Sequence, residues 1–256
     1  MIFYFSGTGN SKHVAFCLAK ATGESCISIT DCMNNGRFSF QLCKDERIGF
    51  VTSVYFWGLP NIVVRFVNEL NIIGLRHNFI YHVVTFGTTT GQAHYMMQKL
   101  LKKKGLWLDA KYNVRMVDVW TPMFDVSNRE KCLRKTGKAD KHIKRVAEMT
   151  IARKTGNFDY LRLPHWMAYW YYLTYEKQRK TRNFHVIKDR CTGCNKCARQ
   201  CPEHAIDIEN GYPVWVKEEC TMCLRCLHHC PGFAIQYGRR TVKHGQFVYP
   251  EEMAKQ

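Results

Sequence analysis

The sequence predicts an α/β protein that ends in a small cysteine-rich domain. Through the first 150 residues, short apolar runs alternate with segments whose apolar residues recur at helical spacing. Such alternation is typical of a parallel sheet covered by helices on both faces. Near residue 156 the alternation stops, and eight of the 13 cysteines fall between residues 191 and 230. We therefore expect a doubly wound sheet followed by a domain organised around its cysteines.

Five apolar runs in the first half have the length and composition of buried strands. They cover residues 2–5, 27–29, 47–53, 79–86 and 111–119. Because each is followed by a turn and a helical segment, the five strands are expected to run parallel in one sheet.

Helical segments lie between these strands. Val14 and Leu18 share one face of the first, and Pro60 opens another, since proline suits the first turn of a helix. A third covers residues 92–104 and stops at Gly105. The run Ser127-Asn128-Arg129-Glu130 has the pattern of a capping box and opens a long final helix.

Composition limits the class of protein. The chain has 256 residues and a mass of 30.0 kDa, with 46% hydrophobic and 23% charged residues, which excludes a disordered or collagen-like chain. No basic segment precedes the apolar run at Ile2, so a secretory leader is not expected. The longest aromatic run, residues 165–175, is shorter than the ~20 apolar residues of a spanning helix. We expect a cytoplasmic protein whose cysteines hold metal rather than disulfides.

The cysteines repeat in two similar runs. Residues 191–202 read CTGCNKCARQCP and residues 220–231 read CTMCLRCLHHCP, so C-x2-C-x2-C-x3-C-P returns 29 residues later. Three thiolates at intervals of three residues can hold one iron–sulfur cube, and the fourth, before proline, turns toward a neighbouring cluster. Zinc sites instead take cysteines in two pairs. The repeat therefore favours iron–sulfur binding over structural zinc.

This repeat resembles the two-cluster ferredoxins of bacteria over residues 184–238. The resemblance implies two 4Fe–4S clusters that exchange their fourth ligands. One cluster would be held by Cys191, Cys194, Cys197 and Cys230, and the other by Cys220, Cys223, Cys226 and Cys201. The other five cysteines lack this spacing and are expected to be ordinary small side chains.

A glycine-rich turn, residues 6–11 (SGTGNS), joins the first strand to its helix. Backbone amides and the positive end of a helix suit a phosphate. A P-loop requires GxxxxGK(S/T), which the position of Lys12 does not fit. A dinucleotide fingerprint requires GxGxxG, and Lys12 stands in place of the third glycine, although Asp31 lies near the ribose-reading position. The turn does resemble the hydroxyl-rich loop of flavodoxins that wraps the FMN phosphate.

Two further segments extend the resemblance to flavodoxins. Residues 54–60 and 85–91 follow the third and fourth strands, where flavodoxin-like proteins place the loops that bind the isoalloxazine ring. The alternative is that the aromatic residues 55–57 belong to the core, but three successive strand residues cannot all point inward. The resemblance implies FMN contacts from Ser6, Thr8, Gly9, Asn10, Ser11, Tyr55, Phe56, Trp57, Gly58, Thr85, Phe86 and Gly87.

Together the two halves resemble a family of prokaryotic flavodoxin–ferredoxin fusions. The resemblance implies a flavodoxin-like sheet of five parallel strands in the order 2-1-3-4-5 and a small α+β two-cluster ferredoxin-like domain. We expect a flavodoxin-like FMN-binding domain over residues 1–155 and an aromatic and basic interdomain segment over 156–183. The ferredoxin-like domain would cover 184–238 and a basic tail 239–256.

The chain is strongly basic, with 38 Lys and Arg against 21 Asp and Glu and a net charge of +17. Much of the excess lies on the predicted helix of residues 129–154 and on the run 177–182. These cations form either a solvated helix face or a docking patch for an acidic redox protein. No nucleic-acid recognition motif accompanies them. Membrane-surface contact through residues 165–182 is a less favoured alternative to a packed interdomain helix.

These features predict an iron–sulfur flavoprotein that relays electrons between two 4Fe–4S clusters and FMN. No Ser/His/Asp set or carboxylate pair suggests other catalysis, so the chemistry belongs to the cofactors. Two alternatives remain, a flavin-dependent reductase of a small acceptor fed by the clusters and a redox-sensing module.

Overall fold

A computed structural model describes residues 1–159 and 163–250 of the chain. Within these residues the centre is a parallel sheet of six strands, ordered β2-β1-β4-β6-β7-β8. The strands are β1 (Ile2–Tyr4), β2 (Cys26–Ser28), β4 (Ile48–Ser53), β6 (Ile80–Phe86), β7 (Ala110–Arg115) and β8 (Gly156–Asn157). The first five follow the predicted order. The prediction of five strands missed β8, because a pair of exposed residues has no apolar periodicity to indicate a strand.

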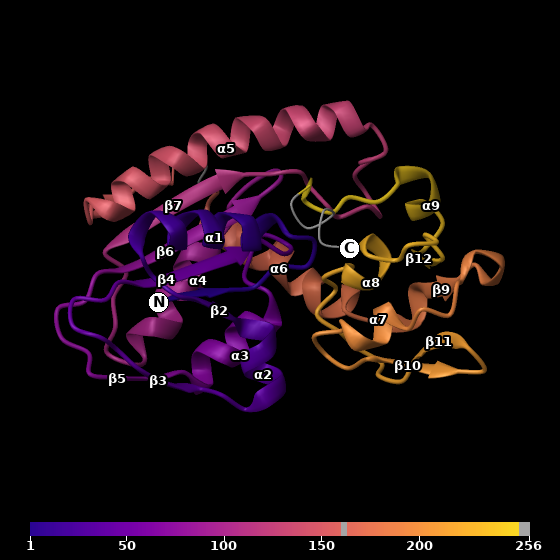
Figure 1. Cartoon of the computed structure of the whole chain (residues 1–256), viewed down its shortest axis with the longest axis horizontal. Coiled ribbons are helices and arrows are strands. Elements are labelled where there is room, and N and C mark those ends of the chain that lie inside the picture. The colour runs from indigo at the N-terminus through magenta and orange to yellow at the C-terminus, as the bar shows by residue number, and fades with distance from the viewer. Residues whose placement is uncertain (160–162, 251–256) are drawn as a thin grey trace.

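Helices cover both faces of this sheet, as Figure 1 shows. α1 (Asn10–Thr22) and α5 (Arg129–Ile151) pack on one face, where Leu18 and Ile143 join one hydrophobic core. α3 (Asn61–Glu69) and α4 (Ala93–Lys102) pack on the other, together with α2 (Ile29–Asn35). The strands between two such layers are buried throughout, and every residue of β6 is inaccessible to solvent or nearly so. Burial on both faces explains why the strands read as continuous apolar runs.

Several elements differ at their ends from the prediction. β7 ends at Arg115 rather than at residue 119, because the chain then leaves the sheet to line a cavity. The N-cap of α5 is Asn128, whose side chain accepts a hydrogen bond from the Lys131 amide, so the predicted capping box at Ser127 is wrong. A short parallel pair, β3 (Ser39–Gln41) with β5 (Asn71–Ile73), lies outside the main sheet and was not predicted.

The C-terminal half is a small α+β domain around the cysteine repeats. β9 (Phe184–Val186) pairs antiparallel with β12 (Ile235–Tyr237), and β10 (Ile206–Glu209) with β11 (Tyr212–Trp215). Within the repeats lie two single-turn helices, α7 (Lys196–Arg199) and α8 (Arg225–His228). The remaining elements are two 3-10 turns, η1 (Thr181–Asn183) and η2 (Lys188–Arg190), and α9 (Thr241–His244).

Helix α6 (His165–Gln178) lies between the two halves and contacts both. The Tyr172 hydroxyl donates to the carbonyl of Leu59 at 2.6 Å, and the Tyr175 hydroxyl donates to the carbonyl of Thr221 at 2.7 Å. No helix within the described residues is both long and apolar enough to cross a lipid bilayer.

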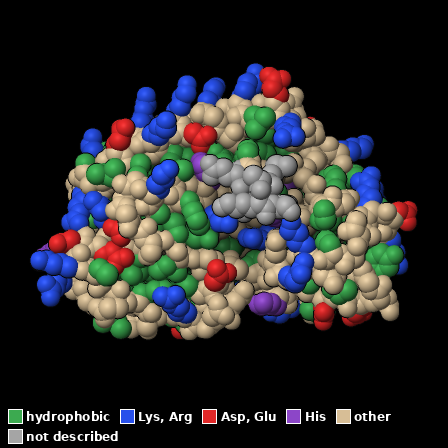
Figure 2. Space-filling view, viewed as in Figure 1, with side chains coloured by type: hydrophobic (Ala, Val, Ile, Leu, Met, Phe, Trp, Pro, Cys, Tyr) green, Lys and Arg blue, Asp and Glu red, His purple; other side chains and the backbone are tan. Residues whose placement is uncertain are grey.

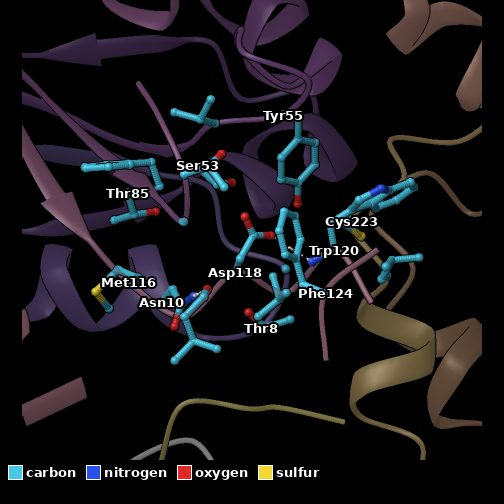
Figure 3. Close-up of a pocket in the computed structure, with 18 of the residues that line it drawn as sticks. Thr8, Asn10, Ser53, Tyr55, Thr85, Met116, Asp118, Trp120, Phe124 and Cys223 are labelled. Atoms are coloured by element: carbon cyan, nitrogen blue, oxygen red, sulfur yellow. Dashed lines mark hydrogen bonds between the residues drawn. The ribbon is translucent and has the colours of Figure 1, made fainter. Parts of the chain in front are cut away.

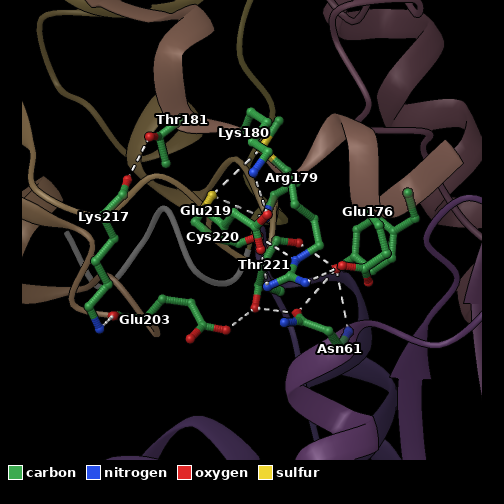
Figure 4. Close-up of polar contacts among 12 residues, drawn as sticks. Asn61, Glu176, Arg179, Lys180, Thr181, Glu203, Lys217, Glu219, Cys220 and Thr221 are labelled. Atoms are coloured by element: carbon green, nitrogen blue, oxygen red, sulfur yellow. Dashed lines mark hydrogen bonds and ion pairs between the residues drawn. The ribbon is translucent and has the colours of Figure 1, made fainter.

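Polar contacts at the end of α6 fix the cluster domain against the sheet domain (Figure 4). The Arg179 guanidinium donates to the carbonyl of Cys220 at 3.1 Å, and Lys180 pairs with Glu219 at 2.7 Å. Arg65 of α3 pairs directly with Glu203 of the cluster domain at 2.6 Å. The two halves therefore form one continuous structure.

Residues 245–250, expected as part of a basic tail, return to the sheet domain. The Tyr249 amide donates to the carbonyl of Thr8 at 2.9 Å, and its ring stacks on His13 at 4.1 Å. The Phe247 amide donates to Nδ1 of His228, whose Nε2 donates to the carbonyl of Val119 at 2.9 Å. Burial lowers the pKa of His228 to about 4, so this linking imidazole is neutral. Residues 251–256 of the predicted tail lie outside the described residues.

Candidate functional site

A cavity of about 300 Å³ opens at the carboxyl edge of the sheet, where β1, β4, β6 and β7 end (Figure 3). This is the edge at which open α/β sheets bind ligands. Ten of the twelve residues predicted to contact FMN line it, namely Ser6, Thr8, Asn10, Ser11, Tyr55, Phe56, Trp57, Thr85, Phe86 and Gly87. Gly9 and Gly58 do not line it and support the neighbouring loops.

The predicted phosphate loop opens directly into α1. Gly9, with a φ of 95°, takes the left-handed backbone conformation at the N-cap, and its amide donates to the Ser6 hydroxyl at 3.0 Å. Thr8 and Ser11 are buried, and no acidic residue stands in the first turn of the helix. The loop therefore offers hydroxyls, amides and the positive helix end to an anion.

The second loop is a tight two-residue turn. Tyr55 and Gly58 exchange both of their backbone hydrogen bonds, at 2.8 and 2.9 Å. Phe56 and Trp57, between them, have φ of 46° and 64°, which bulky residues rarely adopt and which costs about 1–3 kcal/mol each. Packing compensates, because Trp57 lies 4.1 Å from Tyr171 of α6 between ring centroids. The turn presents three aromatic side chains to the cavity.

The third loop follows β6 and is pressed against its neighbours. A Cβ on Gly87 would lie 2.2 Å from a carboxylate oxygen of Asp118, so only glycine fits there. A Cβ on Gly91 would likewise lie 2.2 Å from the carbonyl of Trp57. The contact at Gly91 holds the second and third loops together, and the contact at Gly87 holds the third loop against the segment after β7.

A fourth wall of the cavity was not predicted from the sequence. After β7, residues 116–120 and then Met123 and Phe124 line the space that residues 55–57 face. Trp120 packs edge-on against Phe56, with ring centroids 5.2 Å apart. An aromatic residue directly after the fifth predicted strand was the available signal, but no pattern in the sequence indicates that this segment folds back over the sheet edge.

Asp118 is the one acidic residue in the lining. One carboxylate oxygen accepts from the Trp120 amide at 3.1 Å, and burial raises the pKa of the group. A carboxylate here places negative charge beside the loop at Gly87. When Asp118 is ionised, its negative charge therefore opposes the uptake of electrons by any redox group in the cavity.

The lining fits a flavin with a phosphate-bearing tail. Asn10 donates through its Nδ2 to the carbonyl of Val117 at 3.0 Å, which fixes its Oδ1 as an acceptor. That oxygen is buried and has no hydrogen-bond partner in the structure. A hydroxyl-bearing chain between phosphate and ring would supply the missing donor. Aromatic walls, an acceptor without a partner and an anion-binding loop are what a flavin with a phosphate-bearing tail requires.

The cysteines form two separate sets, each around a small cavity. Cys191, Cys194 and Cys197 line one together with Cys230 from the second repeat. Cys220, Cys223 and Cys226 line the other together with Cys201 from the first repeat. The structure thus brings together the two crossed sets of cysteines that the resemblance implies as ligands. No group of His, Cys, Asp or Glu within the described residues is placed to hold a single metal ion, and the thiols stand around hollows instead.

Each cavity fits a cluster with thiolate ligands. Ala205 and Ala234 each lie four residues after the last cysteine of a repeat, and their amides donate to the Sγ atoms of Cys201 and Cys230 at 3.3 Å. Such hydrogen bonds favour the thiolate form. Burial raises the pKa of Cys220 and of Cys223 to about 12. These thiols ionise at neutral pH only next to strong positive charge, which iron provides.

Cys223 lines both its own cysteine cavity and the cavity at the sheet edge. Its neighbours Met222 and Leu224 also line the sheet-edge cavity, and both have positive φ, at 56° and 52°. A Cβ on Gly7 would lie 2.5 Å from the carbonyl of Cys223, so glycine permits this close approach. One cysteine loop therefore forms a wall of the candidate flavin site, which the sequence alone did not indicate.

Comparisons with known proteins agree with this division of the chain. A family model described as a flavodoxin domain matches residues 1–142, and one described as a 4Fe-4S dicluster domain matches residues 185–231. No curated protein matches.

Two solved structures are similar at low identity. A protein described as a flavoprotein, from Bacteroides uniformis ATCC 8492, is 14% identical over 46% of this chain and 90% of its own, with a TM-score of 0.35. The rubredoxin oxygen:oxidoreductase of Desulfovibrio gigas is 16% identical over 56% of this chain and 35% of its own, with a TM-score of 0.33.

The two matched domains are those of an iron–sulfur flavoprotein that takes part in electron transfer. They also fit the geometry, since most of the lining of the sheet-edge cavity comes from the first domain and the cysteine sets lie in the second. The flavodoxin match covers more than half of the 256 residues. The chain therefore belongs to the flavodoxin domain family and carries a 4Fe–4S dicluster domain fused behind it.

Proposed function

We propose that the chain relays electrons between two 4Fe–4S clusters and one FMN. The observation that carries this proposal is the position of Cys223, which lines one cysteine cavity and the sheet-edge cavity together. A cluster on Cys201, Cys220, Cys223 and Cys226, here called the proximal cluster, would lie next to the flavin. The cluster on the other set is then the distal cluster.

Exposure of the cysteines supports an order for the relay. Cys194 of the distal set is exposed, whereas no cysteine of the proximal set is. An external one-electron partner would therefore meet the distal cluster first, and the proximal cluster would connect it to FMN. When bound, the clusters exchange single electrons and the flavin exchanges one or two.

Side chains of this chain shield the junction between the two cofactor sites. Met222 and Leu224 are almost wholly buried, at 3% and 2% exposure, and lie on either side of Cys223. Trp120 covers the same region from the sheet side and packs on Tyr237 of the cluster domain, with centroids 5.9 Å apart. These apolar groups keep water away from the path between the cofactors.

The composition of the holoprotein tests the proposal. Protein purified without oxygen should contain about eight irons and one FMN per chain, as two cubane clusters and one site require. A reduced ferredoxin should then reduce the flavin rapidly, and protein that keeps FMN but has lost its iron to a chelator should react slowly. Stoichiometric zinc with little iron, or equal flavin reduction after chelation, would contradict the relay.

At the flavin end of the relay, the partner that we propose is an acidic redox protein that binds α5. Eight exposed cations lie on this helix, and Figure 2 shows a row of them along the edge of the molecule that α5 occupies. They are Arg129, Lys131, Arg134, Lys135, Lys138, Lys141, Lys144 and Arg145. Lys135 acts electrostatically on Asp118 in the cavity lining, so the N-terminal half of α5 lies within reach of the flavin site.

Charge reversal on α5 should slow electron exchange with such a partner. Replacing Arg134, Lys138, Lys141 and Arg145 by Glu removes the attraction, which acts over roughly 10 Å at 0.1 M salt. Rates should fall mainly through association, as they should when salt is raised for the wild type. Reversal of the four lysines at the end of α4, residues 99 and 102–104, is the matched control. If the rates changed neither with salt nor with the α5 substitutions, the cations of α5 would form a solvated helix face and not a docking site.

Asp118→Asn should raise the midpoint potential of the bound flavin by tens of millivolts, because a neighbouring carboxylate opposes the uptake of electrons. Since burial raises the pKa of Asp118, the wild-type group loses its charge as the pH falls. The difference between variant and wild type should therefore be large at high pH and shrink at low pH. Spectroelectrochemical titration at several pH values measures it, with exposed Asp125→Asn as control. An unchanged potential at high pH would show that Asp118 does not face the flavin.

A further inference from the structure

Helix α6 carries two apolar stripes on different faces. Ala168, Tyr172 and Tyr175 recur at intervals of four and three residues and pack between the two halves of the molecule. A second set recurs at the same helical spacing and consists of Trp166, Tyr169, Trp170 and Leu173. Residues at i, i+3, i+4 and i+7 share one face of a helix. The second stripe therefore faces away from the protein.

This second stripe is exposed to an extent unusual for large apolar side chains. Trp166 and Trp170 are 67% and 66% exposed, Tyr169 is 52% exposed and Leu173 is 41% exposed. Tyr95 of α4, 48% exposed, extends the patch through its contact with His165, with ring centroids 4.7 Å apart. Contiguous exposed patches of this kind mark interaction surfaces.

Charge at the C-terminal end of the stripe is positive. Lys177 continues the stripe by one further turn and is exposed, as is Arg182 beyond the helix. The one carboxylate of this helix, Glu176, is paired with Arg179 at 2.5 Å. The surface next to the aromatic patch thus offers cations to an anionic partner.

We propose that α6 binds the surface of a membrane that contains anionic lipids. Trp and Tyr combine an apolar ring with a polar N–H or O–H and are enriched where a bilayer meets water. Two tryptophans and a tyrosine on one stripe would enter the headgroup region, and Lys177 and Arg182 would pair with lipid phosphates. The other stripe of the same helix holds it to the protein, so the helix would lie flat on the membrane.

This placement would orient the flavin site toward the lipid. Tyr171, next to Trp170 in the chain, lines the sheet-edge cavity and packs on Trp57. Met123, also in the lining, is 57% exposed. Membrane binding would therefore bring the rim of the cavity close to the bilayer surface.

Vesicle flotation of the holoprotein tests this surface. Wild type should float with phosphatidylcholine vesicles that contain phosphatidylglycerol, and less with phosphatidylcholine alone. Trp166→Ala combined with Trp170→Ala should lower the partition coefficient by about tenfold or more, because two large apolar side chains lose their lipid contacts. Lys177→Glu with Arg182→Glu should lower binding to the anionic vesicles by at least about fivefold per charge.

Trp107→Ala is the matched control, since Trp107 is 57% exposed but lies on the loop after α4, outside the stripe. Its partition coefficient should equal that of wild type. Flavin and iron contents show that each variant is folded. Wild type that fails to float with either vesicle overturns the proposal. So does a wild-type dimer that the double Trp variant converts to monomer without any vesicle binding, because a second copy would then cover the stripe.

Discussion

Cys201→Ala should abolish the proximal cluster and leave the distal cluster intact, although Cys201 follows the three distal ligands in the sequence. In the structure, Cys201 lines the cavity of Cys220, Cys223 and Cys226, and Cys230 takes its place in the first set. Iron content should fall from about eight to about four per chain. Because the proximal cluster lies between the distal cluster and FMN in the proposed order, electron delivery to the flavin should also be lost.

EPR spectroscopy that resolves the two clusters measures the first effect, and stopped-flow reduction by ferredoxin measures the second. Cys43→Ala is the control, since Cys43 is exposed and belongs to neither set. Selective loss of the distal signal in the Cys201 variant would show that the ligands are not exchanged. Fast flavin reduction in that variant would remove the proximal cluster from the path.

Thr8→Glu should prevent FMN binding. Thr8 is 2% exposed and lines the cavity at the loop proposed to hold the phosphate. Two like charges about 4 Å apart repel by about 4 kcal/mol at the effective dielectric of a protein surface, so affinity should fall by about a thousandfold or more. Thr8→Val keeps the shape and removes only the hydroxyl, so its affinity should fall by about tenfold.

Flavin content after purification and fluorescence titration of flavin-free protein measure both variants. The visible spectrum of the clusters shows whether the Thr8→Glu protein keeps its fold. Full flavin occupancy in a protein with intact clusters would mean that the phosphate binds elsewhere.

Much of the fold could be predicted because its signals are local. The runs that became β4 and β6 are buried on both faces, and burial on both faces requires continuous apolar sequence. Helix α2 was not predicted because it has only seven residues and begins directly after β2, whose last residue, Ser28, is its N-cap. For β8, two exposed residues carry no pattern at all.

The candidate site was predictable only in part, for a related reason. Three loops follow the ends of neighbouring strands, so their meeting at one sheet edge follows from the parallel topology. The fourth wall at Asp118 and Trp120, and the cysteine loop at Cys223, reach the cavity through tertiary packing between distant segments. The trace of the cysteine loop in the sequence is Gly7, whose missing side chain admits the carbonyl of Cys223. The trace of the fourth wall is Trp120, directly after the fifth predicted strand.

Anomalous diffraction at the iron edge, from crystals of the holoprotein grown without oxygen, tests the central claim most directly. The account predicts two groups of four iron atoms, one within each cysteine set, and flavin density in the sheet-edge cavity. The group held by Cys201, Cys220, Cys223 and Cys226 should be the one next to the flavin, with Cys223 between them. A single metal ion at either set, or a flavin bound away from Cys223, would contradict it.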